Sequence, residues 1–410
     1  MNKTTRVVIV TELFRPDETS TAFVMSKIAD YLAEDFKLII VAGPEFNQNN
    51  SRKYKIVCGK TENIDIKRVW APNLIKTNLV ARIFRFIIVS IGLSWALLKI
   101  AKTGDVILTV TNPATLIVFL AAIRKVKRVN LVLLVHDVFP ENAVAVGLMS
   151  GKSLIYKIAK WVLNVSYSVA DSLIVIGRDM AEVVAKKTGK SQQAIWLIEN
   201  WAELEVIKPI ARRRSRIKLW GFSKQIVIQY AGNIGHAQGV LEFVELIKGS
   251  RNRSIQYIFA GQGALVPALT KSCENDSRIC FVGGFSRSDQ SMVLGSCDIA
   301  VVLLKPGMYG LGVPSKVYNI MASGKPILYI GPVNSEVYML ISEFEIGWSF
   351  AWDEGQKVIA LLNSLSKIDA EKWDSMGKRA RLAAEVFYSE SVQLKKFSRV
   401  INAYSAKVGV

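Results

Sequence analysis

The chain has 410 residues, half of them hydrophobic, and its 53 Lys and Arg against 34 Asp and Glu give a formal net charge of +19. This length is too great for one ordinary core and predicts two domains, while the charge indicates an anionic partner: nucleic acid, a phosphorylated small molecule or an acidic membrane face. The four cysteines form no Cys-x-x-Cys pair, which argues against a disulfide framework and a zinc site.

The beginning of the chain, "MNKTTRVVIVTELF", runs from a few polar residues directly into a strand pattern. It lacks the apolar core and small-residue cleavage site of a signal peptide. We therefore expect a cytoplasmic protein.

Apolar runs alternate with helical patterns through the first half of the chain. Strands are expected at "RVVIV", "KLIIVA", residues 66–70, "DVILTV", "NLVLLVHD" and "DSLIVI", with helices near residues 20–34 and 80–101. Continuous apolar strands separated by helices are typical of a parallel sheet covered on both faces.

Two apolar segments raise the question of a transmembrane helix. Residues 106–123 carry no charge, but Pro113 in their middle favours a buried strand over residues 106–110 and a short buried helix from Pro113. Residues 86–98 are too few to span a bilayer and predict a core or interfacial helix.

Basic residues flank both apolar segments. They are Arg82, Arg85, Lys99 and Lys102 around residues 86–98, and Arg124, Lys125, Lys127 and Arg128 after residue 123. Each basic residue near an anionic surface contributes roughly 1 kcal/mol, so this set predicts peripheral attachment of the N-terminal domain to an anionic membrane. The alternative is that both segments are ordinary core helices with solvated basic ends.

The alternation restarts after a basic, irregular stretch near residues 203–220. Apolar runs follow at "QIVIQYAG", "IQYIFAG", "RICFVGG", "DIAVVLL" and "PILYIG", with a helix near residues 238–247. The sequence therefore predicts an α/β protein with two doubly wound domains, over residues 1–205 and 206–385. A C-terminal helix over residues 386–410 has the N-terminal domain as a candidate packing surface.

Residues that follow strands are the informative ones, because ligands of doubly wound sheets bind beyond the carboxyl ends of the strands. "LVLLVHDVFPENAV" places His136 and Asp137 just past a buried strand. A histidine there can hydrogen-bond a sugar hydroxyl or stabilise charge in a cleft. Alternatively, His136 satisfies a local backbone group. The other histidine, His236, lies in the strand-end loop "GNIGHAQG".

Two glycine-rich loops, "YAGNIGHAQG" and "AGQGAL", are similar to loops that cradle phosphates. Neither matches the dinucleotide fingerprint or a P-loop. For Gly261 and Gly263 a tight strand-to-helix turn is the simpler interpretation.

A stronger signal is "GVPSKVYNIMASGKPILYIG", residues 312–331. We expect Ser315 to cap a short helix, with Lys316 beside it and the flexible "KPGMYGLG" before it. A helix start offers unpaired N–H groups and the positive end of the helix dipole, which together with a lysine suit a diphosphate. A structural cap explains Ser315 alone but not the whole run.

These motifs give the chain a family resemblance over nearly its whole length. "TELFRPDETSTA", "HDVFPENAVAVGL", "LIENWAELEVIKP", "YAGNIGHAQG", "GVPSKVYNIMASGKPI" and "SEVYMLI" resemble the retaining glycosyltransferases of family 4, and most closely the colanic-acid and O-antigen type. The resemblance implies the GT-B fold, in which two Rossmann-like domains face each other across a cleft. It also implies a nucleotide-sugar donor, expected to be a UDP-sugar, on the C-terminal domain and an acceptor on the N-terminal one.

The resemblance implies a donor site made of strand-end residues of the second domain. Its expected members are Asn233, Gly235, Gln238, Arg287, Lys305, Gly312, Ser315, Lys316, Asn319 and Glu336. Two departures stand out. Many members carry an Arg and a Lys where this chain has Asn233 and Gln238, so Lys316, with Lys305 and Arg287 behind it, is the best substitute cation. The family's ribose-binding glutamate falls at Asn319.

The implied mechanism is front-face transfer with retention, in which the donor diphosphate helps deprotonate the acceptor hydroxyl. No protein nucleophile is expected, and the enzyme acts by positioning and charge stabilisation, with His136 and Asp137 as the candidate catalytic residues. No metal or cofactor is implied, because no Asp-x-Asp pair stands at a strand end.

The expected partners are a lipid-linked or oligosaccharide acceptor of cell-surface polysaccharide biosynthesis and the inner face of the cell membrane. Two other functions stay open. One is a sugar-nucleotide epimerase of the same architecture. The other is a basic nucleic-acid-binding protein, which the net charge permits although no helix-turn-helix, zinc or aromatic-ribbon motif appears.

Overall fold

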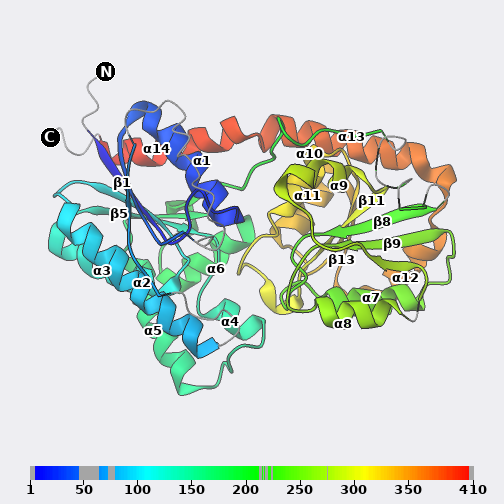
Figure 1. The fold of residues 1–410 in the computed structure, drawn as a ribbon, viewed down its shortest axis with the longest axis horizontal. Coiled ribbons are helices and arrows are strands. Elements are labelled where there is room, and N and C mark those ends of the chain that lie inside the picture. The colour runs from blue at the N-terminus through cyan, green and yellow to red at the C-terminus, as the bar shows by residue number, and fades with distance from the viewer. Residues whose placement is uncertain are drawn as a thin grey trace.

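The computed structural model describes residues 5–45, 64–72, 79–211, 225–274 and 276–405, together with Ser215, Ile217 and residues 220–222. Its two α/β domains lie side by side (Figure 1). The predicted fold class is confirmed, because each domain is built on a parallel sheet with helices on its faces.

The N-terminal domain contains a seven-stranded parallel sheet of order β3-β2-β1-β4-β5-β6-β7 among the described residues. Its strands are β1 (Arg6–Thr11), β2 (Lys37–Ala42), β3 (Ile64–Arg68), β4 (Val106–Val110), β5 (Asn130–Val135), β6 (Ser172–Val175) and β7 (Ile195–Leu197). Its helices are α1 (Ser20–Asp35), α2 (Leu79–Ile100), α3 (Ala114–Lys127), α4 (Glu141–Ala145), α5 (Leu154–Val169) and α6 (Arg178–Thr188).

The C-terminal domain repeats this arrangement with a six-stranded parallel sheet of order β10-β9-β8-β11-β12-β13, again counted over the described chain. Its strands are β8 (Ile226–Ala231), β9 (Ile255–Ala260), β10 (Ile279–Phe281), β11 (Ile299–Leu303), β12 (Ile327–Ile330) and β13 (Gly347–Phe350). Its helices are α7 (Val240–Gly249), α8 (Val266–Cys273), α9 (Gln290–Gly295), α10 (Lys316–Ala322), α11 (Glu336–Phe344), α12 (Gly355–Ser364) and α13 (Ala370–Phe387).

Most of the strands are where the apolar runs predict them, but β3 begins two residues before the predicted range 66–70, and β7 and β13 were not predicted. Every residue of β4 and of β8 is buried, as expected for strands of a parallel sheet covered on both faces. In both sheets the order of strand addition reverses beside the first strand: β2 pairs with one edge of β1 and β4 with the other, and β9 and β11 flank β8 in the same way. A crevice therefore opens at the carboxyl ends of these strands, where doubly wound sheets bind ligands.

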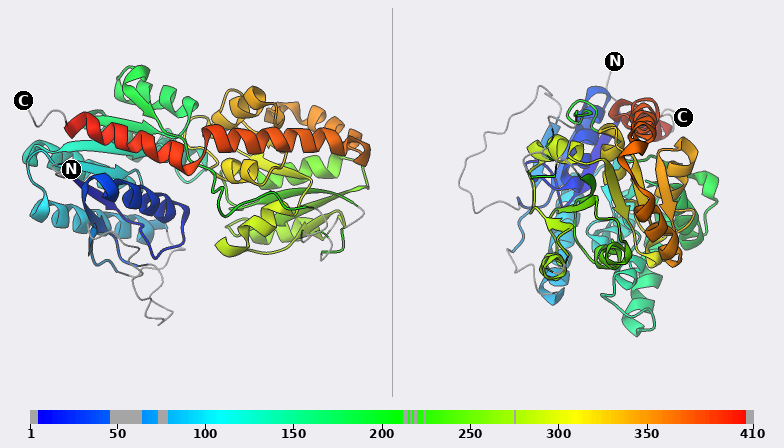
Figure 2. Two further views of the ribbon diagram at one scale, coloured as in Figure 1. Left: turned by 90° about the horizontal axis from the view of Figure 1, so that it is seen from above. Right: turned by 90° about the vertical axis from the view of Figure 1, so that its right-hand side faces the viewer.

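The last helix, α14 (Glu390–Ser405), returns from the C-terminal domain to the N-terminal one (Figures 1 and 2). It packs against α1, and Lys27 Nζ lies 3.0 Å from Glu390 Oε1. The chain crosses between the domains twice, and the two crossings run side by side, since Ala202 N–H donates to the Tyr388 carbonyl over 2.8 Å. The domains are thus joined by a paired connection.

The two apolar segments of the sequence fold into the N-terminal domain. Residues 106–123 form β4 and the first part of α3, with Pro113 as the residue before the helix, as predicted. Among the described residues, one helical segment, Ile83–Ile100 in α2, is long and apolar enough to cross a membrane, and 28% of it is buried. Its inner face belongs to the domain core, where Val89, Leu93 and Leu97 are fully buried.

Candidate functional site

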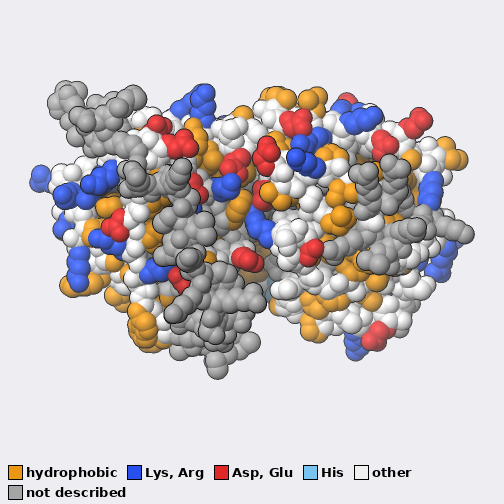
Figure 3. All heavy atoms as spheres, turned by 45° about the horizontal axis from the view of Figure 1, so that its top comes forward, with side chains coloured by type: hydrophobic (Ala, Val, Ile, Leu, Met, Phe, Trp, Pro, Cys, Tyr) orange, Lys and Arg blue, Asp and Glu red, His pale blue; other side chains and the backbone are white. Residues whose placement is uncertain are grey.

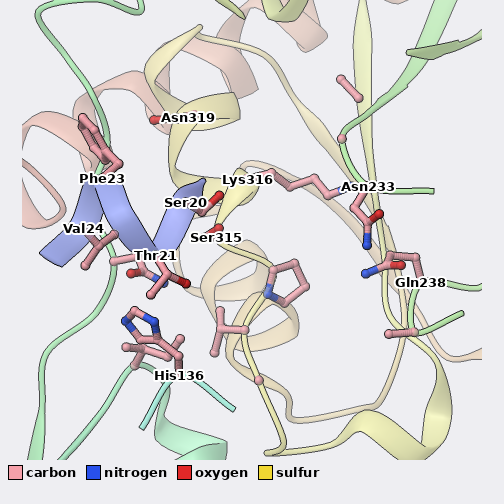
Figure 4. A pocket seen from close by; sticks show the side chains of 18 of the residues that line it. Ser20, Thr21, Phe23, Val24, His136, Asn233, Gln238, Ser315, Lys316 and Asn319 are labelled. Carbon is pink, nitrogen blue, oxygen red and sulfur yellow. The ribbon is translucent and has the colours of Figure 1, made fainter. Parts of the chain in front are cut away.

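A cavity of about 550 Å³ lies between the two domains. This volume is in the range of small-molecule sites in proteins, roughly 300–1,000 Å³. The N-terminal domain contributes the first turn of α1 and the loop after β5, and the C-terminal domain contributes the loops after β8 and β11 and the start of α10 (Figure 4). The cavity thus lies where the sheet topology predicts a ligand.

The structure brings nine of the expected site residues to this cavity. They are His136, Asp137, Asn233, Gln238, Arg287, Gly312, Ser315, Lys316 and Asn319. Gly235 lies in the same loop as Asn233 and Gln238, and its N–H donates to Gln238 Oε1 over 3.2 Å. Lys305 and Glu336 lie outside the cavity lining.

Ser315 lies at the start of α10, but the prediction that it caps this helix is wrong. Its φ of −57° and ψ of −22° are already helical, and its side chain makes no capping hydrogen bond. A capping side chain reaches the N–H groups of the first turn from an extended backbone, which Ser315 does not have. The turn begins one residue earlier, with Val317 N–H donating to the Pro314 carbonyl over 3.1 Å. The hydroxyl of Ser315 is therefore left exposed at the cavity.

Lys316 extends from α10 towards the loop that contains Asn233 (Figure 4). Its Nζ is enclosed by protein, has no hydrogen-bond partner among the described residues, and lies 3.5 Å from the ring centroid of Tyr230. Burial lowers the pKa of Lys316 from 10.5 to about 7. An enclosed amine that lies over an aromatic face without a hydrogen-bond partner in the described chain gains a great deal from an anion placed beside it.

Glycines let the loop after β8 come close to its neighbours. Gly232 has a φ of +133°, and a Cβ on it would lie 3.2 Å from Lys316 Nζ. Gly261 and Gly263 also have positive φ, and a Cβ on either would collide with a backbone carbonyl oxygen of this loop, at 1.8 and 2.2 Å. The tight-turn interpretation of Gly261 and Gly263 is thus confirmed.

Arg287 and Asn319 meet at a residue that the sequence did not single out, Glu203. Arg287 Nη2 donates to Glu203 Oε2 over 2.5 Å, and Asn319 Nδ2 donates to Glu203 Oε1 over 2.8 Å. The guanidinium of Arg287 also lies 3.5 Å from the ring centroid of Phe23 in α1. Glu203 therefore places a carboxylate at this end of the cavity, although α10 has Asn319 and no glutamate there.

His136 lies at the N-terminal side of the cavity, below Thr21 of α1 (Figure 4). Its Nε2 is buried without a partner among the described residues, and burial lowers the pKa of His136 from 6.5 to about 4, so the imidazole is neutral at pH 7. Neighbouring Asp137 accepts a 2.8 Å hydrogen bond from Asn142 Nδ2. Burial raises the pKa of Asp137 from 3.8 to about 6.

The two expected residues outside the lining have other partners. Lys305 Nζ lies 2.8 Å from Glu242 Oε1. Glu336 is 1% exposed and joins the domains, since its carboxylate accepts hydrogen bonds from the guanidinium and from the backbone N–H of Arg178 at the start of α6. Glu336 therefore fixes the domain interface instead of facing the cavity.

The loops after β5 and β11 also meet at this interface. Val138 N–H donates to the Leu311 carbonyl over 3.0 Å, and a Cβ on Gly312 would lie 3.1 Å from Asp137 Oδ1. Asp179 accepts a hydrogen bond from Gly310 N–H over 3.2 Å. Burial and the nearby charge of Glu336 raise the pKa of Asp179 from 3.8 to about 6.

Sequence reasoning missed Glu203, Asn142 and the first turn of α1. All are in the motifs quoted for the family resemblance, "LIENWAELEVIKP", "HDVFPENAVAVGL" and "TELFRPDETSTA". The quoted motifs thus contain these residues. Which residues of each motif reach the cavity depends on how the two domains pack.

Comparisons with known proteins give one relative that matches nearly the full chain and another that matches less than half of it. The chain is 30% identical over 404 residues to the probable glycosyltransferase WbjE of Pseudomonas aeruginosa, covering 97% of both proteins. It is 24% identical over 183 residues to the putative colanic acid biosynthesis glycosyl transferase WcaI of Escherichia coli (strain K12), over 42% of this chain and 44% of that protein. No family model matches the chain.

Among solved structures, Anabaena HepE in complex with UDP and glucose has a TM-score of 0.71 with this chain at 14% identity. The match covers 97% of this chain and 100% of that one. At this identity the likeness shows the fold, which is GT-B.

Proposed function

The chain belongs to the glycosyltransferases with the GT-B fold, and from this premise we propose that it transfers a sugar from a nucleotide-sugar donor to a saccharide acceptor with retention of the anomeric configuration. The donor is a UDP-sugar, and the acceptor is a lipid-linked saccharide of a cell-surface polysaccharide. The family 4 motifs and the relative named for colanic acid biosynthesis support this pathway class. The neighbour solved with UDP and glucose supports the donor. Family membership disfavours both alternatives, the epimerase and the nucleic-acid-binding protein.

The observation that carries this proposal is the enclosed amine of Lys316. A buried ammonium without a hydrogen-bond partner destabilises the folded protein unless a ligand supplies an acceptor for it. A diphosphate next to Gly232 and Ser315 would supply the missing acceptor, and Gly232 leaves the room for it because it has no Cβ. The donor's leaving group would thus lie between α10 and the loop after β8.

The ribose of the donor fits the end of the cavity where Asn319 and Glu203 meet. Glu203 accepts from Asn319 Nδ2 and Arg287 Nη2, and a carboxylate has further lone pairs for the two ribose hydroxyls. Glu203 would therefore supply the carboxylate that the family resemblance places at residue 319.

The reaction then proceeds on one face of the donor sugar. The bond between the anomeric carbon and the diphosphate oxygen breaks, and its electron pair stays on the diphosphate. The acceptor oxygen bonds to the same face of that carbon, and its proton passes to the departing diphosphate oxygen. Lys316 stabilises the charge that develops on the diphosphate, and neutral His136 holds a hydroxyl of the transferred sugar.

A melting-temperature panel of UDP-, GDP-, ADP- and dTDP-sugars tests the donor, because a ligand that binds only the folded protein raises its stability in proportion to occupancy. We expect the UDP-sugars to give the largest rise. Proton NMR of the product with the best donor then reads the anomeric configuration. A panel without any shift, or a product of inverted configuration, contradicts the proposal.

Glu203→Gln should reduce the preference for UDP over 2′-deoxy-UDP roughly fivefold to tenfold, because a hydrogen bond to a carboxylate is stronger by about 1 kcal/mol than one to the neutral amide that replaces it. The comparison of two ligands matters because the change also frees Arg287, which affects both ligands alike. Isothermal titration calorimetry measures the four dissociation constants. Glu205→Gln is the matched control, since Glu205 is exposed and lies outside the cavity lining. If the preference for UDP over 2′-deoxy-UDP is unchanged in Glu203→Gln, Glu203 does not bind the ribose.

A further inference from the structure

Helix α5 presents an apolar face to solvent. Ile155 is 72% exposed, Ile158 55% and Trp161 69%. These residues are three or four apart along a helix and lie on one side of it, whereas Leu163 and Tyr167 on the other side are buried in the core. Nothing in the described chain covers the outer stripe.

Helix α2 presents a second apolar face on the same layer of the domain. Phe84, Ile91 and Trp95 are exposed there, Trp95 by 61%. Helix α3 packs against both α2 and α5, so the three helices form one layer. Figures 1 and 2 show α2 and α5 along the lower side of the N-terminal domain, opposite α13 and α14. We call the outer faces of α2 and α5, with α3 between them, the α2/α5 surface.

The charge on this layer has one sign. The segments Leu79–Ile100, Ala114–Lys127 and Leu154–Val169 contain Lys and Arg but no Asp or Glu. Three of the cations are neutralised by neighbours. Arg85 pairs with Glu12 and Arg124 donates to Asp171. Lys160 lies 3.7 Å from Glu141. Figure 3 shows basic side chains along the outer edge of the N-terminal domain and hydrophobic ones at its lower edge.

Other basic side chains of this layer remain available for a partner. Lys125, Lys127, Arg128 and Lys157 have no acidic partner among the described residues. Lys99 lies 5.3 Å from the ring centroid of Trp95, so a cation and an indole are displayed together.

We propose that the α2/α5 surface docks on an anionic lipid bilayer. Large apolar side chains flanked by unpaired cations fit the boundary between acyl chains and acidic headgroups, and indole rings favour that boundary. The inner faces of both helices are built into the core, so the protein lies on the bilayer and does not cross it. The inference does not depend on which reaction the cavity performs.

The surface lies next to the cavity. Asn142 of α4 lines the cavity, and α5 lies against α4, since Lys160 Nζ is 3.7 Å from Glu141 Oε1. A bilayer against α5 would therefore hold a lipid-linked molecule close to the side of the cavity that carries His136. The sequence pointed to α2 and to the basic end of α3, whereas α5 is identified by the exposure of its stripe.

The test is cosedimentation of the whole protein with vesicles of phosphatidylcholine alone and of phosphatidylcholine with phosphatidylglycerol. We expect binding that needs phosphatidylglycerol and is released by high salt. Ile155→Glu with Trp161→Glu should lower the partition coefficient roughly 10- to 100-fold, because two anchors become anions. The matched control is Leu382→Glu in α13, which is 60% exposed on the other domain and should bind like the wild type.

Melting temperature and UDP affinity of both variants serve as controls on folding and on the cavity, and both should equal those of the wild type. Failure of the wild type to bind anionic vesicles would overturn the proposal, as would unchanged binding by the double variant. Binding that resists salt and alkaline carbonate would indicate a spanning helix instead. A dimer in light scattering that the double variant disperses, without an effect of lipid, would assign the surface to a second copy of the chain.

Discussion

Lys316→Ala should weaken binding of the nucleotide-sugar donor by about 2–3 kcal/mol, roughly 30- to 160-fold in dissociation constant. The amine is enclosed at the cavity without a hydrogen-bond partner in the described chain, so an anionic ligand gains its full charge-assisted contact. Isothermal titration calorimetry with the UDP-sugar that raises the melting temperature most would measure the loss. Lys305→Ala is the control, because Lys305 is paired with Glu242 outside the cavity and its loss should leave affinity unchanged.

The same lysine should couple donor binding to proton uptake. Burial lowers the pKa of Lys316 to about 7 in the free protein, and a diphosphate beside it would raise the pKa again. Affinity is therefore expected to fall as the pH rises from 7 to 9, and the binding enthalpy at pH 7.5 should depend on the ionisation enthalpy of the buffer. Lys316→Met should abolish both effects. Equal enthalpies in phosphate and Tris for the wild type would refute the coupling.

The lowered pKa of Lys316 also predicts a trend in stability. The unfolded chain binds the proton up to a pKa of 10.5 and the folded protein only up to about 7, so the unfolded state holds more protons between these values. The free energy of unfolding should therefore rise with pH from about 7 to 10, and this rise should be smaller in Lys316→Met. Urea unfolding across that pH range would measure it.

His136→Ala should lower kcat on the order of 10²-fold, the scale for removing one donor or acceptor aimed at the reacting group. The melting temperature at pH 7.5 should change little, because Nε2 of His136 has no partner to lose among the described residues. The control is His236→Ala, since His236 is exposed and lies outside the cavity lining. A large fall in melting temperature with normal turnover would favour a structural histidine.

The pKa of His136 gives a second readout. It is about 4 in the folded protein and 6.5 in the unfolded chain, so the unfolded state holds more protons between these values. The wild type should lose stability as the pH falls from 6.5 towards 4, and His136→Ala should lose less. The pH profile of kcat should show no titration of His136 near 6.5, because the imidazole is already neutral there.

Much of the fold was predictable from the sequence because its signals are local. The apolar run "VILTV" is β4 with the predicted bounds, and Pro113 is the residue directly before the following helix, where a proline interrupts no helical hydrogen bond. The alternation of apolar strands and helices restarts near residue 226, where β8 begins, and this restart predicted the second domain. Strand-end positions then brought most of the expected site residues to one cavity, since parallel strands end at the same edge of a sheet.

The partners of individual side chains were not predictable in this way. Glu336 pairs with Arg178, which is 158 positions away, and thereby joins the domains instead of facing the ligand. Glu203 reaches Asn319 across 116 positions and places a carboxylate where the helix has none. Such contacts depend on how two separately folded sheets pack against each other, and no local pattern encodes that geometry.

The sequence by itself determined the two doubly wound domains, the net positive charge that favours an anionic partner, and the motifs that line the cavity. Tertiary structure decided which cations remain available. Lys316 is enclosed without a hydrogen-bond partner among the residues that the structure describes, whereas Lys305 and Arg287 are paired with Glu242 and Glu203. It also left the apolar stripe of α5 exposed, although its spacing resembles that of a core helix. The physical reason is that periodicity states which residues share a face, while burial depends on whether another element covers that face.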